Sequence, residues 1–388
     1  MPYNRTKTKK GIYLPPAVGY SFKILFNLVK ANRISLKYTP RLLLVLIINL
    51  INYPFRQYER FIINSKIRKK TIDDAPIFII GHWRSGTTHL HNLLCQDSQM
   101  GYTTTYQSVF PDTLFNKLGL FLFKGITKIL MPGNRAGDNV RLEASFPQEE
   151  EFALGSKTQI CFYYFWMFPR NLLAYYTDFI RLKNPKRNLL ESWKEDYKLL
   201  IKKALRNTNK KIYLSKNPSN TGRIKILLDM FPNAKFVHIH RNPVEVFVST
   251  QKFFYKMLPH LQFQTITYKE IDDAIFVLYK NLMDDYFEQK HLIPKENLFE
   301  FSFDQLQEKP LFTLSDLYLG LNMNGFEKAQ PKFTAYLKSV DQYKKNKHHI
   351  KKEHLDRLLL EWDAYMISLN YSVPDTIEID HDYEEKHI

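Results

Sequence analysis

The sequence predicts an α/β fold in which helices flank a central parallel β-sheet in three layers. Four short apolar runs have the length and β-branched content of buried parallel strands: 77–80, 212–214, 235–239 and 298–301. Segments of helical spacing lie between them, so strands and helices alternate along the chain. This alternation is typical of a single parallel sheet with crossover helices.

The chain divides into three parts by composition. We expect one main domain over 71–375, preceded by a helical extension (1–70) and followed by an acidic tail (376–388). The extension contains the apolar run 42–51, LLLVLIINLI, which is shorter than the roughly 20 residues that span a bilayer. We therefore expect a buried or interfacial helix there, with peripheral contact at the inner face of a membrane, and no signal peptide before it.

The charge and cysteine content narrow the partners and the compartment. A formal net charge of +17 favours polyanionic partners such as nucleic acid, anionic lipid headgroups or phosphorylated small molecules, without choosing among them. The two cysteines, Cys95 and Cys161, form no CxxC pair, which argues against a zinc ribbon or a disulfide framework. This cysteine usage fits a reducing compartment, and we expect a cytoplasmic protein.

The first chemical motif joins the strand at 77–80 to the helix that follows it. It reads GHWRSGTT from Gly81 to Thr88, and its two glycines have the G-x4-G spacing of a phosphate-binding loop. Such a loop turns backbone N–H groups toward an anion, and the following helix offers its positive N-terminus to the same anion. Nucleoside-triphosphate enzymes place lysine after the second glycine, where this chain has Thr87. The basic residue is instead Arg84, which suits planar oxyanions.

The second motif is a strand that ends in arginine. Arg241 follows the strand 235–239, Pro243 opens a helix, and Ser249 lies two turns along it. A guanidinium and a hydroxyl make a phosphate pocket, although an arginine in this place is also typical of a surface ion pair. Strand ends far apart in the sequence converge at one edge of a parallel sheet, so both motifs are expected at one site.

The string PIFIIGHWRSGTTHLHNLL resembles the 5′-phosphosulfate loop of the PAPS-dependent sulfotransferases, above all the bacterial branch and the tyrosylprotein sulfotransferases, where the loop also carries RSGTT. PAPS is 3′-phosphoadenosine-5′-phosphosulfate, the donor of the sulfuryl group. The resemblance implies a fold like that of the P-loop nucleotide enzymes and no metal. It implies that Arg241 and Ser249 bind the 3′-phosphate of PAPS. It also implies a 5′-phosphosulfate site made of Arg84, Ser85, Gly86, Thr87 and Thr88.

Transfer to a hydroxyl requires a base within hydrogen-bond reach. The segment from Glu149 to Leu154 resembles an E-x-E-F-A-L pattern of bacterial sulfotransferases, and on that basis Glu149 or Glu151 is expected as the base. The residues alone do not separate these two from Glu150 or from a histidine near the loop, and acidic residues also suit a helix N-terminus. Lys216 resembles a family residue near the transferred group, and Lys345 lies in a basic segment that resembles the family's nucleotide-closing loop.

The acceptor is expected to be a small-molecule or lipid-like hydroxyl compound. The aromatic run CFYYFWMF from Cys161 to Phe168 suggests either a pocket lining or a core element, and the apolar helix near the N-terminus favours a hydrophobic alcohol. Two alternatives stay open at this point: a P-loop kinase or NTPase, and a non-catalytic basic protein that binds nucleotides or polyanions. No sequence-specific nucleic-acid partner is expected, and the sequence does not set the oligomeric state.

Overall fold

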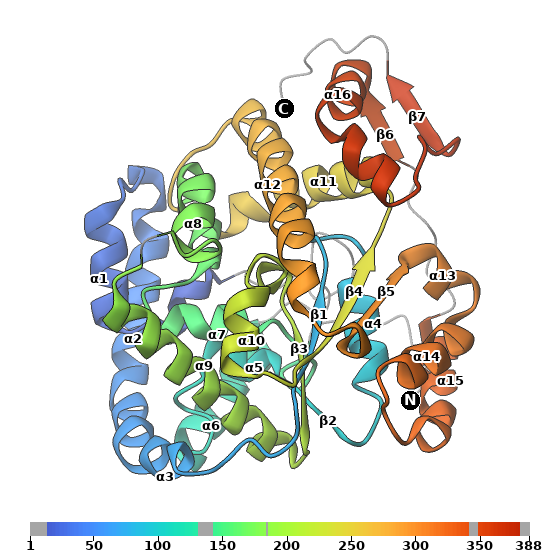
Figure 1. Ribbon diagram of the computed structural model, residues 1–388. Helices are drawn as coiled ribbons and strands as arrows, with labels where there is room; N and C mark the ends of the chain where they lie inside the picture. Colours follow the sequence, from blue (N-terminus) through green and yellow to red (C-terminus); the bar gives the residue numbers. More distant parts are fainter. Residues whose placement is uncertain (1–13, 131–142, 184, 341–347, 381–388) are drawn as a thin grey trace.

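A computed structural model describes residues 14–130, 143–183, 185–340 and 348–380. Five parallel strands form its central sheet, in the order β2-β3-β1-β4-β5 (Figure 1). Their bounds are β1 Ile77–Ile80, β2 Met100–Gly101, β3 Ile212–Lys216, β4 Lys235–His240 and β5 Leu298–Ser302. The four strands predicted from apolar runs are confirmed, with small differences at their ends. The two-residue strand β2 was missed because it is too short to carry a pattern.

Alternate residues of the central strands face two different hydrophobic clusters. Ile77 and Ile79 of β1 belong to one cluster, and Phe78 and Ile80 to the other. This is the alternation expected of a strand whose two faces are both covered. Helices supply most of the other residues of both clusters, so each face of the sheet is covered by a helical layer. This confirms the predicted three-layer α/β class.

Helices cover both faces of the sheet (Figure 1). The cluster that contains Ile79 draws on four of them: α4 Thr87–Leu94, α13 Phe303–Glu308, α14 Pro310–Gly320 and α15 Phe326–Val340. The cluster that contains Ile80 is larger and includes residues of these helices: α7 Glu150–Lys157, α8 Leu172–Phe179, α9 Arg187–Thr208, α10 Ile224–Met230, α11 Pro243–Leu261, α12 Tyr268–Gln289 and α16 Lys352–Ser368. Two further helices complete the main part of the chain: α5 Thr105–Val109 and α6 Lys117–Leu130.

The N-terminal segment is helical, as its sequence predicts. It comprises α1 Phe22–Ala31, α2 Thr39–Tyr58, a π-helical turn Glu59–Ile63 and α3 Asn64–Arg68. Ala17, Tyr20 and Ile24 are buried in the larger hydrophobic cluster, so this segment shares its core with the sheet domain. Within the described ranges, no helix is both long and apolar enough to cross a membrane.

The C-terminal region differs from the expected acidic tail. The strand β6 His348–Lys351 pairs in parallel with β7 Ile377–Asp380, and α16 connects the two. Ile377 is buried, whereas Glu378 and Ile379 are exposed, so only the first residue of β7 packs inward. The tail predicted from residue 376 therefore contains a strand, which is too short to stand out from the acidic composition around it.

The strand order creates a topological switch point at the carboxyl edge of the sheet, next to β1. From β1 the chain proceeds to β2 and β3 on one side and then crosses to β4 on the other side. Ligands of open α/β sheets bind outside the strand ends at such a switch point. Because β3 and β4 both pair with β1, the segments after these three strands lie next to one another.

Candidate active site

The loop after β1 has the backbone conformation of an anion cradle. Gly81, Arg84 and Gly86 all have positive φ, at 137°, 72° and 96°. An added Cβ at Gly81 would lie 2.2 Å from the Ile239 carbonyl oxygen, and one at Gly86 would lie 2.2 Å from the ring of Phe303. Glycine is thus required at both places, and the turn directs backbone N–H groups into a concave surface that suits an anion.

The helix α4 begins at Thr87, directly after this loop, with Gly86 as its N-cap residue. No side chain caps it, so the N–H groups of its first turn are available to an anion. The Ser85 hydroxyl does not face that turn. It is buried and donates to the Ile239 carbonyl oxygen (2.9 Å), which ties the loop to β4.

The two predicted phosphate-binding arginines lie over aromatic rings. Arg84 Nε donates to Ser249 Oγ (3.0 Å), and its guanidinium lies 5.0 Å from the centroid of Phe253. The Arg241 guanidinium lies 4.9 Å from the centroid of Phe303. Since Phe303 also borders Gly86, the ends of β1 and β4 meet around this ring. The structure therefore brings the two sequence motifs together.

The pairing inside the second motif differs from the expectation. Ser249 and Arg241 were expected to share one phosphate, and the Ser249 hydroxyl is here hydrogen-bonded to Arg84. Arg241 instead pairs with Glu245 one turn along α11 (2.8 Å). This ion pair is the alternative that an arginine at a strand end suggests. The Arg241 guanidinium still lies beside the loop, over Phe303. Both side chains of the ion pair are only partly buried.

The three adjacent glutamates have three different environments, and Glu149 is the one beside the loop. It precedes α7 and is hydrogen-bonded to the Tyr163 hydroxyl and to the Lys216 ammonium. Lys216, at the end of β3, also donates to Thr88 Oγ1 (3.3 Å) in the first turn of α4. The carboxylate is thus one side chain away from the anion cradle.

Glu150 and Glu151 point into the protein and are fully buried. Burial alone would raise the pKa of Glu151, but the Arg223 guanidinium, at 2.7 and 3.0 Å, and hydrogen bonds from Asn217 and the Phe162 amide lower it. Burial raises the pKa of Glu150, which accepts a hydrogen bond from Tyr197 (2.6 Å). Neither carboxylate reaches the loop, because both are held by interior partners.

Hydrogen bonds connect the loop with Glu149 through Tyr163, which was not among the predicted site residues. Trp83 Nε1 donates to the Tyr163 oxygen (3.0 Å), and the Tyr163 hydroxyl donates to Glu149. Burial and the neighbouring carboxylate raise the pKa of Tyr163, so the phenol keeps its proton. Tyr163 belongs to the aromatic run 161–168, which is buried throughout and forms core rather than a pocket wall. Phe152, half-buried, packs on its ring at 4.6 Å.

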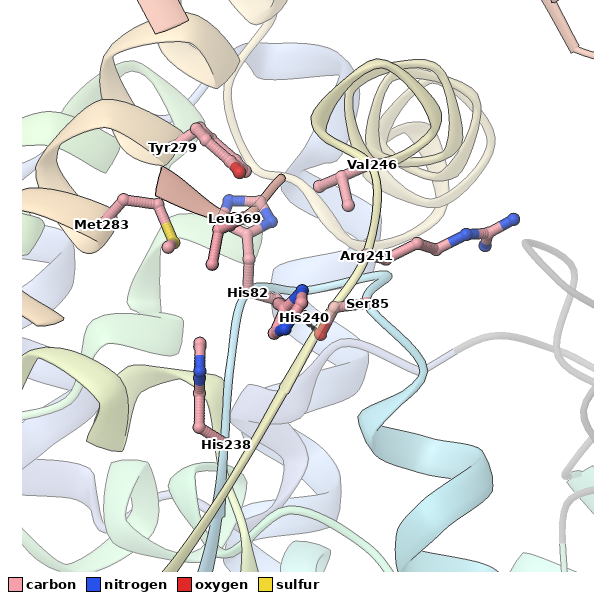
Figure 2. A pocket seen from close by; sticks show the side chains of 9 residues that line it. All are labelled: His82, Ser85, His238, His240, Arg241, Val246, Tyr279, Met283 and Leu369. Atoms are coloured by element: carbon pink, nitrogen blue, oxygen red, sulfur yellow. Dashed lines mark hydrogen bonds between the residues drawn. The ribbon is translucent and has the colours of Figure 1, made fainter. Parts of the chain in front are cut away.

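A small pocket behind the loop is lined by three histidines, and Arg241 points away from them (Figure 2). Burial lowers the pKa of His82 and of His240 to about 4, and it also lowers that of His238. These rings are neutral at pH 7 and do not attract phosphate. Positive charge around the loop therefore comes from Arg84, Arg241 and the N-terminus of α4 rather than from these histidines.

The residues at this edge fit a nucleotide with two separate anionic groups better than a magnesium triphosphate. Lys216 is the last residue of β3, while Arg84 and Arg241 follow the neighbouring strands β1 and β4. Thr87 replaces the lysine of triphosphate enzymes. Among the residues that the structure describes, no group of three or more His, Cys, Asp or Glu side chains could hold a metal ion. Lys345, expected in a loop that closes on the nucleotide, lies outside the described residues.

Comparisons with known proteins agree with this geometry. A family model described as "Sulfotransferase family" matches residues 76–328. The chain is 29% identical over 338 residues to the omega-hydroxy-beta-dihydromenaquinone-9 sulfotransferase Stf3 of Mycobacterium bovis and of Mycobacterium tuberculosis, which covers 87% of this chain and 86% of those proteins.

Two solved structures share the fold. Sulfotransferase STF9 from Mycobacterium avium superposes with a TM-score of 0.64 at 16% identity, covering 92% of this chain and 98% of that one. Sulfotransferase STF1 from Mycobacterium tuberculosis gives 0.60 at 14% identity, covering 81% of this chain and 85% of that one.

The chain belongs to the sulfotransferase family, because the family model matches more than half of it. It is an enzyme that moves a sulfuryl group from PAPS to an acceptor hydroxyl. The kinase and the non-catalytic alternatives, both open on sequence grounds, are therefore set aside.

Proposed function

We propose that the edge of the sheet binds PAPS at two places. The loop Gly81–Thr88, the N-terminus of α4 and Lys216 take the 5′-phosphosulfate, while Arg241 and Ser249 take the 3′-phosphate. The proposal is supported by the positive φ angles of the loop, by the uncapped first turn of α4 and by the two arginines on aromatic rings. Arg84, assigned to the 5′-phosphosulfate, and Ser249, assigned to the 3′-phosphate, are hydrogen-bonded to each other, which supports one common site.

Glu149 is the proposed general base, and the observation that carries this assignment is its position between Tyr163 and Lys216. Of the three glutamates, Glu149 is the one whose carboxylate contacts Lys216, and Lys216 is hydrogen-bonded to Thr88 at the end of the loop. Glu151 is better suited to a structural role, because Arg223, Asn217 and a backbone amide already use both of its oxygens.

In the proposed mechanism, PAPS supplies the sulfuryl group, and the protein supplies position and charge. Glu149 accepts the proton as the acceptor oxygen forms its bond to sulfur, while the bond from sulfur to the phosphate oxygen breaks in line. Lys216 and Arg84 stabilise the negative charge on the sulfuryl and departing phosphate oxygens. Tyr163 and Trp83 hold the carboxylate in place, so that proton transfer starts from a fixed geometry.

The proposed acceptor is a lipid-like alcohol. The mycobacterial relatives are named for a menaquinone derivative that carries an omega-hydroxyl group. In this chain the half-buried ring of Phe152 packs on Tyr163, which places apolar surface next to the proposed base. The proposal includes peripheral contact with the inner face of a membrane and a cytoplasmic location, which the two free cysteines suit.

The experiment for the donor site is calorimetric titration with PAP, the desulfated product, against ATP and ADP. We expect PAP to bind at least tenfold more tightly than ADP, and Arg241→Ala to remove most of this preference, since a charge-assisted hydrogen bond contributes about 2 kcal/mol, or roughly thirtyfold. Arg357→Ala is the matched control, because Arg357 also pairs with a glutamate four residues on and lies over a phenylalanine ring. Equal binding of ADP and PAP would contradict the 3′-phosphate assignment.

A further inference from the structure

In helix α2, three polar residues lie on the inward face together with Val45, and most of the large apolar residues face outward. Asn49, Asn52 and Arg56 are all buried. Asn49 Nδ2 donates to the Ala17 carbonyl oxygen (2.9 Å) and Arg56 to that of Gly19 (2.8 Å), so the inward face is held by hydrogen bonds to the preceding segment. A surface helix in water has the reverse arrangement.

The outward face of α2 is apolar along its whole length and extends into the π-helical turn. Its members recur at helical spacing, and Leu50 is 65% and Phe61 74% exposed. The exposed face comprises Leu43, Leu44, Ile47, Leu50, Ile51, Tyr58, Phe61 and Ile62.

A second helix, distant in sequence, widens this surface. The rings of Phe55 in α2 and Phe123 in α6 are 6.0 Å apart, and Gly119 lets α6 approach Phe55 closely. On its outer side α6 exposes Leu118, Phe121 and Leu122. These three residues and the exposed residues of α2 and its π turn together form what we call the α2–α6 face. Contiguous apolar surface of this kind marks an interaction site.

The segment that carries α2 is strongly basic. Between residues 14 and 72, all of which the structure describes, the one acidic residue is Glu59, and it is fully buried. Exposed lysines and arginines stand before α2 and at the end of α3: Lys23, Lys30, Arg33, Lys37, Lys66, Arg68, Lys69 and Lys70. Arg68 is paired with Asp196 of α9, and the other seven are on a segment that exposes no acid of its own. An apolar stripe with basic residues before and after it is complementary to an anionic lipid surface.

We propose that the α2–α6 face docks the enzyme on an anionic phospholipid bilayer, with the apolar side chains in the acyl boundary and the flanking lysines and arginines at the headgroups. The bilayer is favoured over a second copy of the chain, because two copies of so basic a segment would repel each other. The inference rests on the proposed function, since a lipid-like alcohol reaches the enzyme from the membrane. It adds the surface through which the enzyme meets that membrane.

The test is sedimentation of the full-length protein with vesicles, without donor or acceptor. Vesicles of phosphatidylcholine alone are compared with vesicles that contain phosphatidylglycerol. The variant Ile47→Glu with Leu50→Glu places two charges on the face, and the control Leu319→Glu with Leu360→Glu places them on residues that are 78% and 84% exposed elsewhere. PAP affinity is measured on all three proteins to show that the fold is intact.

We expect the wild type and the control to bind the anionic vesicles, with weaker binding at high salt and with phosphatidylcholine alone. The Ile47/Leu50 variant should bind them at least about tenfold more weakly while keeping its PAP affinity. The proposal is overturned if the wild type binds neither vesicle, if the variant binds as well as the wild type, or if the wild type is a dimer that this variant converts to a monomer. Failure here leaves the PAP titration unchanged, so the two proposals are tested separately.

Discussion

Replacement of Glu149 by glutamine tests the proposed base with little change of shape. The amide keeps the volume of the side chain and still accepts a hydrogen bond from Tyr163, but it takes up no proton. General-base catalysis contributes about 10²- to 10⁴-fold, so we expect kcat to fall by about a thousandfold, or roughly 4 kcal/mol of transition-state stabilisation. Affinity for PAP should stay equal or increase, because Lys216 loses a competing carboxylate.

The assay is single-turnover transfer from radiolabelled PAPS to an alcohol that the wild type sulfates, with PAP affinity measured in parallel. Glu151→Gln is the matched control. It leaves the fully buried Arg223 without its charged partner, and it should lower the free energy of unfolding by about 3–5 kcal/mol. Glu149→Gln also removes the charged partner of the buried Lys216, but Lys216 keeps its hydrogen bond to Thr88 and Glu149 is not fully buried, so its cost should be smaller, about 1–3 kcal/mol. The reasoning is refuted if Glu149→Gln keeps a tenth or more of the wild-type rate while Glu151→Gln, still folded, loses it.

Three further predictions concern the loop, the core and pH. Gly86→Ala puts a methyl group against an aromatic ring at positive φ and should weaken PAP binding at least tenfold; the same change at Gly125, which meets nothing within 4 Å, should not, and equal effects would sink the idea. Arg223→Met leaves Glu151 buried and unpaired and should cost about 3–5 kcal/mol in urea unfolding; a loss below 1 kcal/mol would show that the pair matters little. Burial lowers the pKa of His82 from 6.5 to about 4, so the unfolded chain binds protons first, and stability is complete above pH 6.5 and falls toward pH 4. The variant His82→Asn should flatten this dependence by about 3 kcal/mol, and an unaltered pH profile of unfolding would contradict the assignment.

Local patterns were sufficient for the parts of the fold that depend on neighbouring residues. The run 77–80, the glycines of the loop and Arg84 occupy one continuous segment, so its strand, turn and helix were predicted from spacing alone. Arg241 was also placed correctly at the end of a strand, because parallel strands bring their carboxyl ends to one edge.

Contacts between distant segments decided what the sequence left open. Glu149 and Glu151 look alike in the sequence, and they differ in the structure because Arg223 comes from beyond β3 while Tyr163 comes from the aromatic run. No spacing rule links these residues. The Arg84–Ser249 contact was missed for the same reason, since it joins the segments after two different strands.

The helix α2 shows the same limit in another form. Its apolar run predicted a buried or interfacial helix, and the choice between them depends on which face turns inward. The orientation of the helix follows from the carbonyl oxygens of Ala17 and Gly19, which accept hydrogen bonds from Asn49 and Arg56 and so hold these polar side chains inside. A pattern within the helix does not contain this information.

The central claim is that the edge formed by β1, β3 and β4 binds a nucleotide with phosphate at both ends. A crystal structure of the enzyme with PAP measures this most directly. We predict the 5′-phosphate between Gly81 and Thr88 and the 3′-phosphate within hydrogen-bond distance of Arg241 and Ser249. A nucleotide bound elsewhere, or one whose 3′-phosphate touches neither residue, would contradict the account.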